Sequence, residues 1–177
     1  IVSNFPNTLN IDISTLESFN DPPNYGYKVM LNNDGNKLIV GSPGYGTQYQ
    51  GLVKTFTTDN NWSTFDTNEL IGENNSMLGF SSTVLSGDGN TMAFGVESNF
   101  SNTDTNTTYY SGVIIYKYIN NSWQENSRIN NDNNVNKFGE NISISNDGNT
   151  LAVYVEILND SGTSTLYDSV KTYKYND

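Results

Sequence analysis

The sequence predicts an all-β protein, and three observations carry this prediction. A short motif around an Asp-Gly-Asn turn recurs three times along the 177 residues. The segments beside each turn alternate polar and apolar residues or are rich in β-branched and aromatic residues, as strands are. Segments longer than about ten residues lack the 3.6-residue periodicity of an amphipathic helix.

The repeat is the strongest signal. The three turns begin at Asp34, Asp88 and Asp147. A second marker, Val-x-x-aromatic, keeps nearly the same spacing and falls at 53–56, 113–116 and 170–173. Because two markers share one period, we expect three copies of one structural unit.

Each unit is predicted to contain four antiparallel strands. The first strand ends at the Asp-Gly pair, which predicts a type I′ hairpin turn with positive φ at both central residues. The second strand follows at once, at 37–41, 91–95 and 150–155. The third is the Val-x-x-aromatic segment, and the fourth carries Trp62 or Trp123 in the first two units.

A four-stranded antiparallel unit of this length predicts a β-propeller blade. We expect an N-terminal segment, 1–24, that supplies a closing outer strand. Blades follow at 25–77, 78–137 and 138–177, and the last lacks its fourth strand. Propellers have about four to eight blades. Three blades therefore imply part of a longer chain, a ring completed by association, or an open stack that polymerises.

The order of motifs resembles the FG-GAP repeats of the integrin α-chain propeller and its bacterial and viral relatives. The resemblance covers 25–175 and is carried by Phe138-Gly139, by the Asp-Gly-Asn turns and by Gly41-Ser42-Pro43. The third unit departs from the pattern, with 154–156 reading Tyr-Val-Glu in place of Gly-Ala-Pro. The resemblance implies a surface protein whose loops can bind calcium.

Calcium sites need several oxygen ligands. The carboxylates of Asp34, Asp88 and Asp147 are the weak candidates, one in each turn. Since one carboxylate does not make a tight site, we interpret these loops as hairpin turns and expect no cofactor, with calcium as the alternative.

Composition excludes several classes of function. The formal net charge of -11 opposes binding to nucleic acids and to anionic membranes. The chain has no Cys and no His, which excludes thiol catalysis, disulfides and Ser-His-Asp triads. No apolar run approaches the roughly 20 residues needed to cross a membrane. We therefore expect no enzyme activity.

Some residues are candidates for contact or modification. Glu97 and Glu156 end the second strand in successive units and could form a glycosidase pair. Exposed tyrosines can anchor a protein partner or stack on sugars. The candidate contact tyrosines are Tyr45, Tyr49, Tyr109, Tyr110 and Tyr167, and the candidate glycosylation sites in the longest loop are Asn99 and Asn106.

These patterns together predict a non-catalytic structural or protein-binding module of a cell-surface, extracellular or virion protein. The expected partner is another protein, or a second copy that completes the propeller. A lectin-like propeller that binds glycans is the alternative, and a carboxylate-based glycosidase ranks below it.

Overall fold

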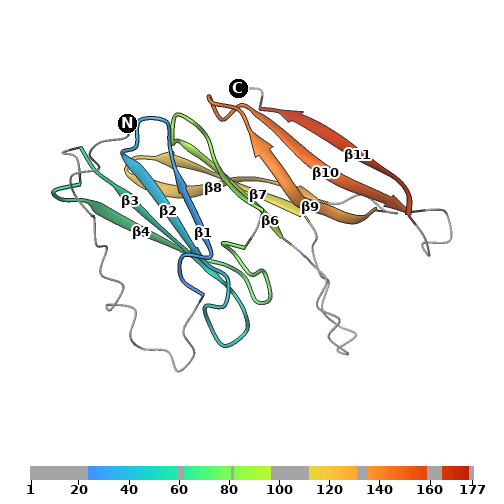
Figure 1. The fold of residues 1–177 in the computed structure, drawn as a ribbon, viewed down its shortest axis with the longest axis horizontal. Coiled ribbons are helices and arrows are strands. Elements are labelled where there is room, and N and C mark those ends of the chain that lie inside the picture. The colour runs from blue at the N-terminus through green and yellow to red at the C-terminus, as the bar shows by residue number, and fades with distance from the viewer. Residues whose placement is uncertain are drawn as a thin grey trace, which may run out of the picture.

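The computed structural model describes residues 24–59, 62–80, 82–96, 112–130, 135–158 and 165–175. These residues form eleven strands and no helix, so none of them belongs to a helix that could cross a membrane. The strands make three antiparallel sheets that stand side by side as separate, unclosed blades (Figure 1). The prediction of an all-β fold built from propeller-type blades is confirmed.

Strands follow one another in sequence order within each sheet. The first sheet contains β1 (Lys28–Leu31), β2 (Lys37–Ser42), β3 (Leu52–Thr57) and β4 (Asp66–Ile71). The second contains β5 (Thr83–Leu85), β6 (Thr91–Val96), β7 (Gly112–Ile119) and β8 (Ser122–Asn130). The third contains β9 (Val135–Ile144), β10 (Thr150–Leu158) and β11 (Thr165–Lys174). The closing strand that we predicted within 1–24 lies outside the described residues, apart from Asn24.

The Asp-Gly hairpins differ from the predicted type I′ geometry. Only the glycine of each pair has positive φ, at 67° for Gly35, 71° for Gly89 and 68° for Gly148. In the second sheet the Gly89 amide donates to the Ser86 carbonyl at 2.9 Å, which closes a turn before the glycine. This is a longer hairpin loop with one left-handed residue, a form in which Asp needs no positive φ.

Each sheet has two faces, which we call leading and trailing. The leading face points toward the preceding sheet and the trailing face toward the following one. Between the first two sheets, Ile39 and Val53 pack against Met92 and Phe94. Between the second and third, Ala93 and Val113 pack with residues that include Leu151, Val153 and Val155. The core therefore lies between the blades.

Glycine lets the blades approach closely. Gly41 on β2 meets Gly79, and a Cβ on Gly41 would overlap the Gly79 carbonyl. Gly95, at the same place on β6, meets Gly139 in the same way. Gly79 and Gly139 have φ of +88° and +83°, which glycine adopts without strain. The glycines of Leu78-Gly79 and Phe138-Gly139 are thus docking points between sheets.

The two tryptophans do not occupy equivalent places. Trp123 lies on β8, directly after a tight turn in which Asn120 and Asn121 both have positive φ. Trp62 precedes β4 and itself has a φ of 66°, so the prediction that it lies on the fourth strand is wrong. The longer connection between β3 and β4 is the reason, because only the two-residue turn continues the ladder at once.

Candidate functional site

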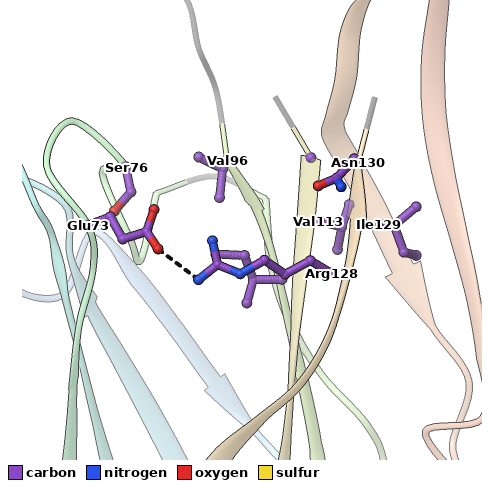
Figure 2. Close-up of a pocket in the computed structure, with 9 residues that line it drawn as sticks. Glu73, Ser76, Val96, Val113, Arg128, Ile129 and Asn130 are labelled. Carbon is purple, nitrogen blue, oxygen red and sulfur yellow. Dashed lines mark hydrogen bonds and ion pairs between the residues drawn. The ribbon is translucent and has the colours of Figure 1, made fainter. Parts of the chain in front are cut away.

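A cavity of about 380 Å³ opens between the first and second sheets. Figure 2 shows Glu73 on one side and Arg128 on the other, with Val96 and Asn130 near the open ends of strands β6 and β8. Val96 and Ile114, whose side chains lie on the leading face of the second sheet, also line the cavity. The cavity thus combines an apolar wall with a few polar groups, as small-molecule sites do.

A β-bulge positions Arg128. Residues three apart on a regular strand point to opposite faces, yet Glu125 and Arg128 meet on one face. The pairing of β8 with β7 shifts between Ile115 and Tyr116, which leaves Asn126 as an extra residue. The bulge therefore brings both charged side chains to the leading face, toward the first sheet.

Arg128 joins the two sheets electrostatically. Its Nε and Nη2 donate to the two oxygens of Glu125 at 2.6 Å and 2.8 Å, and Nη2 also donates to Glu73 Oε1 at 2.8 Å. The hydrogen bond from Arg128 holds the pKa of the Glu125 carboxyl below its usual value. Hydrogen bonds to Glu125 and then Glu73 raise the pKa of Arg128, so this guanidinium stays charged.

The loop after β4 holds Glu73 in place. Ser76 is buried and its Oγ donates to the Gln50 carbonyl at 2.7 Å. The amides of Asn75 and Leu78 donate to carbonyls of the loop after β2, at 2.8 Å and 3.1 Å. Although the loop is fixed, the Glu73 side chain is 62% exposed and can contact a ligand.

The charge of this site limits what it can bind. Two carboxylates and one guanidinium leave a formal charge of -1, so a further anion would have to displace Glu73 or Glu125 from Arg128. Neutral groups face no such competition, since Glu73 can accept from hydroxyls while Arg128 donates to them. The arrangement favours an uncharged ligand with several hydroxyls.

The aspartates singled out for calcium lie at the exposed tips of the hairpins. Asp88 Oδ1 accepts from Ser86 Oγ at 2.5 Å and from the Asn90 amide at 2.9 Å. Burial raises the pKa of Asp88, but these hydrogen bonds outweigh it and the pKa is lowered. Asp147 makes the same contacts with Ser145 and Asn149, which lower its pKa. Both carboxylates thus accept hydrogen bonds from residues of their own hairpin turns.

Asp34 is exposed at the tip of the first hairpin, where Asn32 takes the place of the serine. Asn32 Oδ1 accepts from the amides of Asn36 and Lys37 at 3.0 Å and 2.9 Å. The described residues contain no group of three or more acidic side chains that could hold a metal ion. The described residues therefore offer no acidic cluster that would support calcium binding at these turns.

Few of the candidate contact residues come together. Tyr45 is half-buried and Tyr49 exposed, both after β2, whereas Tyr167 is exposed on β11 of the third sheet. Glu156 lies 3.9 Å from Lys137, and its proposed partner Glu97 lies outside the described residues. So do Tyr109, Tyr110, Asn99 and Asn106.

Sequence reasoning missed the residues of the cavity. Arg128 is the only arginine of the chain, and a lone guanidinium in so acidic a protein was a usable signal. No sequence pattern pointed to Glu73, because Glu73 and Arg128 are 55 positions apart and meet only when the first two sheets pack together.

Comparison with known proteins yields similarity of structure alone. No family profile and no curated protein matches the sequence. The chain is similar to the crystal structure of a putative 6-phosphogluconolactonase from Bacteroides uniformis, with a TM-score of 0.44, 12% identity, and coverage of 83% of this chain and 40% of that one. A second, from Bacteroides fragilis, has a TM-score of 0.44, 15% identity, and coverage of 81% and 40%.

These findings correct the predicted family. The resemblance to FG-GAP repeats is wrong, since no family profile matches and the similar structures carry another name. In this chain the turn glycines close hairpins and the other motif glycines let neighbouring sheets approach, so these motifs reflect packing and do not identify a family.

The prediction of a non-catalytic structural or protein-binding module is corrected as well, together with the prediction that the chain is not an enzyme. The expected extracellular, cell-surface or virion location stays a prediction. The similar structures are named after a lactonase activity. The chain spans less than half the length of those proteins, and the likeness assigns no substrate and no active-site residue to it. The fold and the cavity define a chain of propeller-type blades with a pocket between two blades.

Proposed function

We propose that this chain binds a small, uncharged, hydroxyl-rich molecule, about the size of a monosaccharide, in the cavity beside Arg128. The observation that carries the proposal is the pair formed by Glu73 and Arg128 across a cavity of about 380 Å³. This volume falls in the range of about 300–1,000 Å³ that is typical of small-molecule sites.

The polar groups suit a ligand with neighbouring hydroxyls. Arg128 offers donors, Glu73 offers an acceptor, and the amide of Asn130 offers both. Val96 and Ile114 provide an apolar wall for the carbon face of such a molecule. Anionic analogues are disfavoured, because the two carboxylates beside Arg128 would repel them.

Isothermal titration with D-glucose and D-glucuronate tests the proposal, since both form pyranose rings and glucuronate differs by a carboxylate in place of the C6 hydroxymethyl group. We expect glucose to bind and glucuronate to bind at least about tenfold more weakly. Glu73→Gln keeps the shape of the side chain, removes its charge, and should weaken glucose binding by about tenfold, or roughly 1.4 kcal/mol.

The matched control is Lys54→Gln. Lys54 and Glu69 form the cross-strand ion pair of the first sheet, at 3.1 Å, in the place that Ile114 and Arg128 occupy in the second. This variant removes an ion pair away from the cavity and should leave binding unchanged. Tighter binding of glucuronate than of glucose, or equal losses in the Glu73→Gln and Lys54→Gln variants, would overturn the proposal.

A further inference from the structure

Three turns of this chain share the sequence Asp-Gly-Asn, at 34–36, 88–90 and 147–149. In such a turn the glycine amide nitrogen can attack the side-chain carboxyl group of the aspartate, and the cyclic succinimide that forms can open to an isoaspartyl linkage. Glycine favours this reaction, because it has no side chain to hinder the attack. The reacting residues are the same in the three turns, so a difference in rate between them must come from the fold.

In the second and third turns, hydrogen bonds hold the aspartate carboxylate. Asp147 Oδ1 accepts from Ser145 Oγ at 2.5 Å and from the Asn149 amide at 3.1 Å. Asp88 makes the equivalent contacts in the second turn. These bonds fix the direction of the carboxylate and stabilise its charged form. The charged form is the weaker electrophile, since a carboxyl oxygen must leave as water, and both effects oppose attack by the glycine.

Asn32 changes this arrangement in the first turn. Its Oδ1 accepts from the amides of both Asn36 and Lys37, at 3.0 Å and 2.9 Å. In the third turn the two equivalent amides donate to different side chains, the first to the aspartate and the second to the serine. Asn32 thus replaces two acceptors with one. The Asp34 carboxylate consequently has no hydrogen-bond partner among the described residues.

The first turn is also the least tightly packed of the three. Asp34 is exposed, and a Cβ on Gly35 would meet no described atom within 4 Å. Gly148, in contrast, is packed against Thr91 of the second sheet, and Gly89 is packed against residues of the first sheet. Because the glycine nitrogen must approach the aspartate side chain during the attack, this packing restrains the second and third turns more than the first.

One feature that slows the reaction is common to the three turns. Each glycine amide donates to the carbonyl three residues earlier, at 3.1 Å for Gly35, 2.9 Å for Gly89 and 3.0 Å for Gly148. This hydrogen bond must break before the nitrogen can attack. Since the three distances are nearly equal, the carboxylate contacts and the packing of the glycine decide which turn reacts first.

We propose that Asp34 is a site of spontaneous covalent modification, at which the bond to Gly35 converts to an isoaspartyl linkage faster than the equivalent bonds of the other two turns. The Gly35 nitrogen forms a bond to Cγ of the protonated Asp34 carboxyl group, and the hydroxyl leaves with the amide proton as water. Water then adds to the main-chain carbonyl carbon of Asp34 and breaks its bond to the Gly35 nitrogen. The main chain now runs through the side-chain carbonyl, the former main-chain carbonyl is a carboxylate, and the mass is unchanged.

The modification would loosen the first hairpin. An isoaspartyl linkage adds one atom to the main chain and so displaces the two amides that donate to Asn32. Lys37, at the end of this turn, donates to the Gly89 carbonyl and to Asn90 Oδ1, both at 3.0 Å. The change therefore reaches the contact between the first two sheets. We expect faster hydrogen exchange of the Asn36 and Lys37 amides in the modified chain.

Ageing of the full chain tests the proposal. The protein is incubated near neutral pH, and the peptides that contain the three turns are separated by chromatography and sequenced by electron-transfer dissociation, which distinguishes aspartate from isoaspartate. We expect Asp34 to isomerise at least about tenfold faster than Asp88 or Asp147. The same chain in guanidinium chloride is the control, because the three unfolded turns should react at similar rates.

Two variants exchange the hydrogen bonds of the turns. Asn32→Ser introduces the serine of the other two turns and should slow isomerisation at Asp34 about tenfold. Ser145→Ala removes the hydroxyl that donates to Asp147 and should speed isomerisation there by a similar factor. The rate at Asp34 in the Ser145→Ala protein should not change, and it serves as the control within the same chain.

Equal rates at the three turns of the folded chain would overturn the proposal, and so would a faster reaction at Asp88 or Asp147. The absence of isoaspartate at Asp34 in the folded chain, under conditions in which the unfolded chain reacts, would overturn it as well. Should Asn32→Ser fail to fold, the comparison of the three turns within the unaltered chain still decides.

Discussion

At the scale of single residues, Tyr154 departs most from the repeat. It stands on β10 where the first two sheets have Gly41 and Gly95, as shown by its pairing with Val170, since Gly41 pairs with Val53 and Gly95 with Val113. Its hydroxyl donates to Asp168 Oδ1 at 2.8 Å. This hydrogen bond, followed by desolvation, raises the pKa of Tyr154 to about 12.

The raised pKa has a consequence for stability. A tyrosine in the unfolded chain titrates near pH 10, so the hydrogen bond stabilises the fold fully below about pH 10 and this contribution is lost as the pH rises through about 12. We expect Asp168→Asn to lower the pKa of Tyr154 toward 10. Carbon-13 NMR of labelled tyrosine, assigned with Tyr154→Phe, measures this, and an unchanged pKa would contradict it.

At the scale of elements, neighbouring sheets are joined by backbone contact between glycines and by apolar side chains. On the trailing faces Val53 and Val113 are 0% and 1% exposed, whereas Val170, at the same place in the third sheet, is 64% exposed. The equivalent strands thus have the same sequence pattern and different burial, according to whether another sheet covers them.

Gly95→Ala tests the glycine contact. The added Cβ would overlap the Gly139 carbonyl, and backbone cannot move aside as a flexible side chain can. We expect the free energy of unfolding to fall by about 3 kcal/mol, measured by urea denaturation. The control is Val170→Ala on the uncovered trailing face of the third sheet, where the side chain is 64% exposed, and it should have little effect. A similar fall in the free energy of unfolding in both variants would show that contact between the sheets does not cause the loss of stability.

At the scale of the whole molecule, the two ends of the stack differ. The outward face of the first sheet has exposed Val29, Leu31 and Ile71. The outward face of the third has Tyr154 where close docking needs glycine, together with Glu156 and Asp168. A polar face of this kind opposes stacking of another sheet, and a formal charge of -11 adds repulsion between copies.

Association in solution tests this asymmetry. We expect the chain not to polymerise by repeating its own blade contact, because Tyr154 blocks the approach of Gly26 from a second copy. Tyr154→Gly should introduce association that depends on concentration, and Gly26→Val should abolish it in the double variant. Sedimentation velocity measures the species present. Head-to-tail oligomers of the unaltered chain would contradict the prediction.

The number of sheets and most strands could be predicted from sequence, because turn residues and alternating patterns act locally. The Asp-Gly-Asn turns and the Val-x-x-aromatic strands lie where the pattern placed them. The turn type was missed, since Asp-Gly suits two hairpin geometries that differ by one residue. Trp62 was misplaced because loop length, and not the spacing from the third strand, sets where the fourth strand begins.

The sequence by itself determined the all-β class, the repeat, and the exclusion of thiol and imidazole chemistry, since each depends on residue type and short-range order. Only the tertiary structure decided which residues meet. The bulge at Asn126 turned Glu125 and Arg128 to one face, and packing of two sheets brought Glu73 to them. These contacts join residues far apart in the chain, and no local pattern encodes such distances.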